Sequence, residues 1–143
     1  MKRIFLDSNI PMYWGGKPSK YLKACGSILK AVAREKVEGI TNAEVLQEIL
    51  YRFWHIRDMD RGRQVFVHFS CIITTVWPVT IEDGILGREL TDSYGIGPRD
   101  LVHVASMRNA DITYIASADR DFDRIELVER IDPLEFEAWL RRD

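Results

Sequence analysis

Apolar residues recur along the chain in two alternating patterns, which predict strands and helices that follow one another. Short apolar runs predict strands at residues 2–6, 40–41, 71–79, 112–116 and 126–131. Apolar residues three and four positions apart predict helices at residues 19–36, 42–54, 80–94, 98–109 and 134–142, with one more helix starting in 57–63. Strands that alternate with helices form βαβ units and a mostly parallel sheet. The pattern therefore predicts the α/β class.

Proline, glycine and capping residues predict where these elements begin and end. Residues 11–18 contain two prolines and two glycines, and this content predicts a loop. Thr41 and Glu44 have the spacing of a capping box, which predicts the start of the helix at 42–54. Thr80 and Asp83 have the same spacing, in an aspartate variant, and predict the start of the helix at 80–94.

The stretch from residue 98 to 123 combines a helix, a strand and a group of acidic residues. Pro98 suits the first position of a helix, where its missing N–H is no loss. The strand at 112–116 is followed at once by Ser117 and Asp119, and then by Asp121 and Asp123. Ligands of open α/β sheets bind at the carboxyl ends of the strands. The position of these residues therefore predicts a ligand site.

Two further acidic residues have both a structural and a functional interpretation. Asp7 ends the first strand, where it is either a turn or cap residue or a ligand for a metal or phosphate. Glu48 borders the apolar stripe of its helix, where an unpaired carboxylate is costly. It either pairs with Arg52, four residues further on, or binds a metal.

The predicted topology brings four carboxylates within reach of one another. Parallel crossovers place successive strand ends at the same edge of a sheet, so Asp7 and Asp119 can lie close together. Asp100, near a helix N-terminus at that edge, and Glu48, from its own helix, can join them.

Converging carboxylates repel one another unless cations are present, and Mg²⁺ or Mn²⁺ prefers oxygen ligands. Two such ions can hold an attacking water and a leaving oxygen on either side of a phosphorus. The chain has no visible Ser-His-Asp arrangement, Gly-rich phosphate loop or Cys/His zinc spacing. His55 and His68 lack metal-ligand spacing and are interpreted as ordinary helical or core residues. The residue types therefore favour metal-dependent phosphodiester chemistry over acyl transfer.

Composition and charge narrow the class of protein. The length of 143 residues predicts one domain, 1–143, and a net charge of −2 requires any contact with nucleic acid to be local or metal-assisted. Two distant cysteines, Cys25 and Cys71, are interpreted as core thiols in a reducing cytosol. We find no apolar run of membrane-spanning length and no signal peptide, so we expect a soluble, cytoplasmic protein.

Four short motifs follow one another along the chain at specific spacings. They are FLDSNI at residues 5–10, ITNAEVLQEIL at 40–50, RDLVHVASMRNADI at 99–112 and ASADRDFDRI at 116–125. Each is short and common, but the four together, in this order, resemble PIN-domain proteins of the VapC-type toxin group. That family consists of small metal-dependent ribonucleases. The resemblance implies a three-layer α/β/α PIN-like domain with a mostly parallel central sheet.

The resemblance also implies a role for individual residues. Asp7, Glu48, Asp100 and Asp119 would be the acidic quartet that holds one or two Mg²⁺ or Mn²⁺ ions, with a metal-activated water attacking an RNA phosphodiester. Asn9 and Ser117 would orient carboxylates or waters around the quartet.

The residues beside the quartet keep more than one interpretation. Of Asp121 and Asp123, one would assist the site and the other would cap or pair with Arg120 or Arg124. Arg99, Arg120 and Arg124 would contact RNA phosphate or form solvated ion pairs. His103, three residues after Asp100, is either a packed helix residue or a substrate contact.

The resemblance favours an endoribonuclease toxin that a cognate antitoxin keeps inactive. A homodimer is also implied, with exposed apolar residues such as Trp54 or Phe69 as candidates for its interface. Two alternatives remain: a PIN nuclease in RNA processing without antitoxin control, and a non-catalytic Mg²⁺-binding α/β module. Against a receiver-like module, Asp7 stands alone after its strand and no lysine follows Lys36.

Overall fold

The computed structural model describes all 143 residues and contains a five-stranded parallel sheet. The strands are β1 (Arg3–Leu6), β2 (Glu38–Asn42), β3 (Thr75–Trp77), β4 (Tyr114–Ala116) and β5 (Glu129–Ile131), in the spatial order β3-β2-β1-β4-β5. Every neighbouring pair is parallel. The predicted α/β class and mostly parallel sheet are confirmed.

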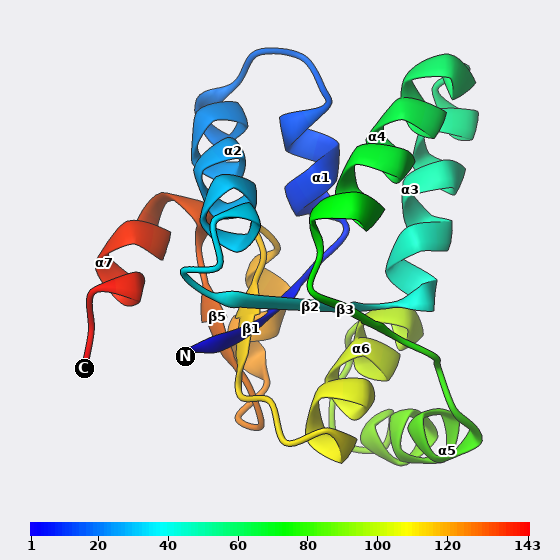
Figure 1. Ribbon diagram of the computed structural model, residues 1–143. Coiled ribbons are helices and arrows are strands. Elements are labelled where there is room, and N and C mark those ends of the chain that lie inside the picture. Colours follow the sequence, from blue (N-terminus) through cyan, green and yellow to red (C-terminus); the bar gives the residue numbers. More distant parts are fainter.

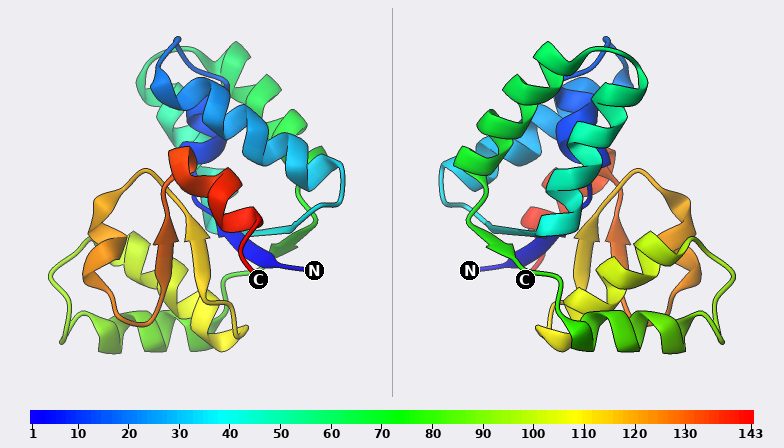
Figure 2. Two further views of the ribbon diagram at one scale, coloured as in Figure 1. Left: turned by 90° about the vertical axis from the view of Figure 1, so that its left-hand side faces the viewer. Right: turned by 90° about the vertical axis from the view of Figure 1, so that its right-hand side faces the viewer.

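Seven α-helices and two 3₁₀ turns cover the sheet. The elements are α1 (Asn9–Trp14), α2 (Lys20–Ala33), α3 (Ala43–His55), α4 (Met59–Ile72), α5 (Ile81–Leu90), α6 (Pro98–Asn109), η1 (Arg120–Arg124), η2 (Pro133–Glu135) and α7 (Phe136–Leu140). Helices α1 to α4 gather on one side of the sheet, and the α5–α6 pair lies on the other (Figures 1 and 2). The three-layer α/β/α arrangement is therefore present.

The order of the strands creates a crevice between β1 and β4. From β1 the chain crosses to β2 and β3 through α1 to α4, and it returns to the other side of β1 through α5 and α6. Leu6 pairs with Ala116, so β1 and β4 end at the same level. Ligands of open α/β sheets bind outside the strand ends at such a reversal of strand order. Asp7 and Ser117 are the first residues beyond these ends.

The central strand is buried on both faces, as expected for a parallel sheet between two helical layers. Ile4, Phe5 and Leu6 are fully buried in β1, and Ile115 is fully buried in β4. They belong to one continuous apolar core to which both helical layers contribute. Because each strand end is fixed by this core, the polar residues that follow it have little positional freedom.

The loop predicted at residues 11–18 is wrong for its first half, because α1 runs from Asn9 to Trp14. Pro11 is the third residue of this helix, where a backbone N–H has no intrahelical partner and its absence costs nothing. The helix ends at Gly15, whose α-carbon lies against Val65 of α4. Pro11 therefore lies in the first turn of a helix and not in a loop.

The capping box predicted for Thr41 and Glu44 is also wrong. Strand β2 continues to Asn42, which is the N-cap of α3 and accepts a hydrogen bond from the Val45 N–H. Thr41 donates its hydroxyl to the Leu6 carbonyl, and Glu44 pairs with Arg99. The box predicted at Thr80 and Asp83 is confirmed, with both reciprocal hydrogen bonds.

Other differences concern the ends of elements and two side chains. The strands at 71–79, 112–116 and 126–131 are shorter than predicted, α5 ends at Leu90, and the last helix begins as a 3₁₀ turn.

Cys25 is buried as predicted, but Cys71 is exposed, so it is not a core thiol. Phe69 is fully buried and unsuited to a dimer interface, whereas Trp54 is exposed. No helix combines the length and apolar character needed to cross a bilayer.

Candidate metal centre

Asp7 lies at the centre of the site, buried at the end of β1. Its carboxylate accepts hydrogen bonds from the Ser8 N–H at 2.8 Å, from the Ser117 hydroxyl at 2.7 Å and from the Asn9 amide at 3.1 Å. Burial raises the pKa of Asp7, opposed by the charge of His103 and by the Ser117 hydrogen bond. The structure thus holds a carboxylate in one orientation, in surroundings that penalise its negative charge.

Ser117 and Asn9 form a small hydrogen-bonded frame between the ends of β1 and β4. Asn9 donates to the Ser117 hydroxyl at 2.9 Å and accepts from the Ala118 N–H at 3.2 Å. The Ser117 hydroxyl also accepts the Asp119 N–H at 3.0 Å. Because Asn9 and the Asp119 N–H both donate to the Ser117 hydroxyl, its own proton is free to point to Asp7. Asn9 and Ser117, which the resemblance named, both contact Asp7.

Glu48 reaches the site from α3 and is almost entirely buried. One oxygen accepts the Ser8 hydroxyl at 3.1 Å, the other lies 2.5 Å from His103 Nε2, and Arg99 is 4.0 Å away. The alternative in which Glu48 pairs with Arg52 is wrong, because no ion pair joins them. Helix α3 begins directly after β2, and Glu48 therefore projects over the end of the neighbouring strand β1.

Asp100 lies in the first turn of α6 and is only partly buried. Its pKa is raised to about 7, because burial and the nearby charges of Asp7, Asp119 and Glu48 disfavour a further anion. His103 opposes this shift. Pro98 occupies the first helical position as predicted, so the helix starts where Asp100 faces the other carboxylates.

Asp119 follows β4 and caps the 3₁₀ turn η1 by accepting the Asp121 N–H at 2.9 Å. Asp121 is half exposed and lies 3.8 Å from Arg124. Potential ligand atoms of Asp100, Asp119 and Asp121 lie within 4.8 Å of one another, as do those of Asp7, Glu48 and His103. The four sequence-predicted carboxylates are thus brought together, in two adjoining groups.

The donor chemistry of the quartet fits a hard divalent cation. Carboxylate oxygens are the ligands that Mg²⁺ and Mn²⁺ prefer, and the hydrogen-bonded oxygens of Asp7 and Glu48 keep lone pairs for a metal. The pKa values of Asp7 and Asp100 are raised mainly because burial disfavours their charged forms, and the neighbouring carboxylates add to the effect at Asp100. A bound cation would favour the charged form of both carboxylates.

The arginines named from the sequence have different environments. Arg99 is 3.3 Å from Glu44 and lies beside Glu48, at the border of the site. Arg120 is exposed and forms no ion pair. Asp123 pairs with Arg130 at 2.9 Å, so the predicted pairing with Arg120 or Arg124 is wrong for this residue. The charged tip of Arg130 also binds the Ser117 carbonyl and Asp132.

Sequence reasoning missed the site contacts of two buried residues, Ser8 and Asn42, and it did not predict the contact of His103 with Glu48. His103 is fully buried, which agrees with the packed interpretation, and its ring centroid lies 5.5 Å from that of Phe5, with the two rings tilted. Burial works against a charged ring, but the hydrogen bond to Glu48 and the charges of Asp7, Glu48 and Asp100 raise the pKa of His103. The available signal was its position one helical turn after Asp100, on the face that carries Ser106 and Met107.

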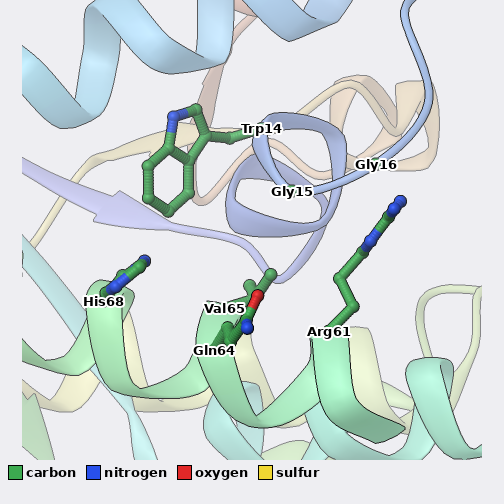
Figure 3. Close-up of a pocket in the computed structure, with 7 residues that line it drawn as sticks. All are labelled: Trp14, Gly15, Gly16, Arg61, Gln64, Val65 and His68. Atoms are coloured by element: carbon green, nitrogen blue, oxygen red, sulfur yellow. The ribbon is translucent and has the colours of Figure 1, made fainter. Parts of the chain in front are cut away.

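A separate cavity of about 350 Å³ lies between the end of α1 and the helix α4. Figure 3 shows its lining, with Trp14 and the two glycines on one side and Arg61, Gln64, Val65 and His68 on the other. None of the quartet lines this cavity. The cavity is therefore distinct from the carboxylate site.

A comparison with known protein families matches residues 4–127 to one of them, the PIN domain. The chain belongs to the PIN-domain family. The VapC ribonuclease Mb1869c of Mycobacterium bovis is 31% identical over 129 residues, which cover 90% of this chain and 98% of the relative. The resemblance to the VapC group read from the four motifs is thereby confirmed.

Solved structures share the fold of this PIN domain. Mycobacterium tuberculosis VapC20, a sarcin-ricin loop cleaving toxin, superposes with a TM-score of 0.71 at 18% identity, covering 88% of this chain and 97% of that chain. A toxin–antitoxin complex from Klebsiella pneumoniae superposes with a TM-score of 0.63 at 14% identity, covering 91% of this chain and 97% of that chain. At these identities the likeness establishes the fold.

Proposed function

We propose that this PIN domain is a metal-dependent endoribonuclease that hydrolyses RNA phosphodiester bonds, and that it acts as the toxin of a type II toxin–antitoxin pair. The observation that carries the proposal is the convergence of carboxylates from β1, α3, α6 and the end of β4 at the strand-order reversal. The VapC ribonuclease relative, which this chain matches over nearly its whole length, supports the same activity.

Asp7, Glu48, Asp100 and Asp119 would hold the ion or ions, with Mg²⁺ or Mn²⁺ as the metal. When bound, a divalent cation supplies a more acidic water and neutralises charge on the phosphate. The protein itself supplies rigidity, since Ser117 and Asn9 fix the Asp7 carboxylate, and Ser8 and His103 fix Glu48. Asp121, near Asp100 and Asp119, is the fifth acidic candidate, at the solvent side of the cluster.

Contact with RNA would be local, because the chain carries a net charge of −2. Arg99 and Arg120 flank the carboxylates, and Arg120 has no competing anion within the chain. Both would offer positive charge to phosphates on either side of the cleaved bond. Arg99 would first have to exchange its ion pair with Glu44.

The partner would be an antitoxin protein, as in the toxin–antitoxin complex whose toxin shares this fold. A homodimer is the second expected assembly. Its candidate surface contains the exposed side chains of Tyr51, Trp54 and Ile56 near the end of α3. Aromatic side chains are enriched in interfaces because they bury much area with few rotatable bonds.

The test is cleavage of structured RNAs by the purified, partner-free protein with Mg²⁺ or Mn²⁺, beside the variants Asp7→Asn and Asp100→Asn. Each variant should lower the rate by more than the roughly 10–100-fold typical of residues that only support a metal ligand. A chelator should abolish cleavage by the wild type. Asp60→Asn is the matched control, since Asp60 is exposed and pairs only with Arg63.

Cleavage that survives unchanged in both variants would show a contaminating nuclease and overturn the site assignment. The toxin role has its own test, expression in bacteria without a partner protein. The wild type should arrest growth, Asp7→Asn should not, and co-expression of the neighbouring reading frame should restore growth. Growth unaffected by a chain that cleaves RNA in vitro would favour an RNA-processing role instead.

A further inference from the structure

A continuous chain of buried polar side chains leads away from Glu48 into the layer formed by α5 and α6. Glu48 contacts His103 Nε2 at 2.5 Å, and His103 Nδ1 lies 3.1 Å from the Asn42 amide nitrogen. The same amide nitrogen donates to the Ser106 hydroxyl at 3.2 Å, which donates to Asp83 at 3.1 Å. All five residues are at most 9% exposed.

The far end of this chain is anchored in the capping box of α5. Asp83 accepts the Thr80 N–H at 3.0 Å and the Asn109 amide at 2.7 Å, in addition to the Ser106 hydroxyl. These hydrogen bonds hold the pKa of Asp83 below its ordinary value, against the effect of burial. Asp83 therefore acts only as an acceptor, and the Ser106 proton points toward it.

The direction of every other bond follows from the backbone. Asn42 is the N-cap of α3, and its carbonyl oxygen accepts the Val45 N–H at 3.0 Å. This contact fixes which end of the amide is which, so the NH₂ group faces His103 and Ser106. In the neutral ring, His103 Nδ1 is then an acceptor and carries no proton. The one proton of the neutral ring lies on Nε2 and is donated to Glu48.

We infer that Asn42 and His103 form a positioning pair, in which the capping amide selects the Nε2–H form of His103 and thereby holds Glu48 in its metal-binding orientation. This inference rests on the proposed function, because it assigns Glu48 to the metal. His103 is a positioning residue in this inference, because its Nε2 is engaged by Glu48 and it acts through that carboxylate. Metal-bound carboxylates and histidines are commonly oriented by such outer partners.

A purely structural role is a poor explanation of this network of buried polar side chains. His103 packs on Phe5 in the apolar core, where a leucine would fill space without a polar group to satisfy. Instead, the His103 ring places two nitrogen atoms there, and no buried side-chain nitrogen or oxygen in the protein lacks a partner. A fully satisfied buried network specifies one arrangement of its members. Its one end outside the core is the Glu48 carboxylate.

The experiment compares His103→Leu, His103→Gln and Asn42→Ser with the wild type. Leucine removes the donor to Glu48, whereas the glutamine amide nitrogen takes nearly the position of Nε2 and restores it. Serine keeps the N-cap acceptor of α3 but removes the amide donor. His68→Gln, at an exposed histidine of α4, is the matched control.

The first readout is Mn²⁺ affinity by calorimetry on metal-free protein without RNA. His103→Leu should lose about 10–100-fold in affinity. The Mn²⁺ affinity of His103→Gln should return to within a few-fold of that of the wild type. The affinity of Asn42→Ser should lie between those of His103→Leu and His103→Gln. In RNA cleavage the same order should appear in kcat, with KM little changed, since His103 does not contact RNA.

The second readout is the ¹⁵N spectrum of the imidazole at mildly alkaline pH. The wild type should show a protonated Nε2 and an unprotonated Nδ1 on His103, and Asn42→Ser should show a mixture of both tautomers. This measurement needs no metal or RNA, and so remains decisive if His103→Leu does not fold.

An Nδ1–H tautomer in the wild type would overturn the inference. So would a folded His103→Leu that binds Mn²⁺ as tightly as the wild type. Wild-type protein that binds Mn²⁺ through Glu48 but cleaves no RNA would overturn the nuclease proposal alone. Loss of affinity in His103→Leu that His103→Gln does not restore would also count against positioning.

Discussion

At the scale of single residues, the site is a set of carboxylates whose charges are only partly compensated. Asp7 and Glu48 each receive hydrogen bonds on both oxygens, whereas Asp100 has no hydrogen-bond donor and relies on solvent. Burial and repulsion from the other carboxylates raise the pKa of Asp100 to about 7. Asp100 is therefore the residue at which proton and metal compete near neutral pH.

This competition predicts how the stability of the metal-free protein depends on pH. The folded state binds the Asp100 proton more tightly than the unfolded chain, whose aspartate pKa is 3.8, so stability should fall as the pH rises from 3.8 to about 7. Asp100→Asn should flatten this fall and stabilise the protein at neutral pH by roughly 1 kcal/mol, a value reduced for partial solvent contact.

Urea unfolding in the presence of a chelator, at a series of pH values, measures this effect. Asp60→Asn, which alters an exposed carboxylate on α4, should leave the wild-type slope intact. A slope in Asp100→Asn as steep as in the wild type would show that other groups bind the extra protons. The buried Asp7, whose pKa is also raised, would then be the first to test.

At the scale of elements, α3 carries Glu48 and is held by its packing against α4. Gly62 of α4 faces Phe53 of α3, and a Cβ added at Gly62 would lie only 2.7 Å from the Phe53 Cβ. Phe53 is buried in the core and cannot move aside without shifting its helix. The close contact of these two helices thus depends on the missing side chain of one residue.

Two glycine-to-alanine substitutions should therefore have opposite effects. Gly62→Ala should destabilise the protein by about 1–3 kcal/mol, because it forces α3 and α4 apart. Gly84→Ala should stabilise it by roughly 0.5–1 kcal/mol, since Gly84 lies inside α5 with no atom near an added Cβ. Thermal unfolding of both variants measures the difference. Equal effects of the same sign would contradict the packing argument.

At the scale of the whole molecule, the four carboxylates come together only in the folded chain. An ion that binds this site therefore binds the native state and not the unfolded one. Saturating Mn²⁺ at about 100 times its dissociation constant should stabilise the protein by about 2.7 kcal/mol. For a chain of this size that corresponds to a rise in Tm of several degrees.

Differential scanning calorimetry with Mn²⁺ and with a chelator tests this linkage. The increment should disappear in Asp7→Asn, although this variant need not be less stable than the wild type without metal, because it removes a buried carboxylate with a raised pKa. An increment that persists in Asp7→Asn would place the ion elsewhere. Figure 2 shows how both helical layers enclose the sheet whose end carries the site.

The sequence by itself determined the elements whose signals are local. Pro98 started α6, Thr80 and Asp83 capped α5, and the alternation of strands and helices required a parallel sheet. These features depend on backbone geometry and on residues close in the chain, so periodicity and capping rules reveal them.

Only the tertiary structure decided which polar groups meet across the chain. Asn42 rather than Thr41 caps α3, because the Thr41 hydroxyl is taken by the Leu6 carbonyl of the neighbouring strand. Asp123 turns to Arg130 on β5, and His103 reaches both Glu48 and Asn42. Three of these contacts join residues 35 or more positions apart, and Asp123 meets Arg130 seven residues further on in another element. A side chain with several possible hydrogen bonds makes the one that the packing of the core brings within reach, and local sequence does not contain that information.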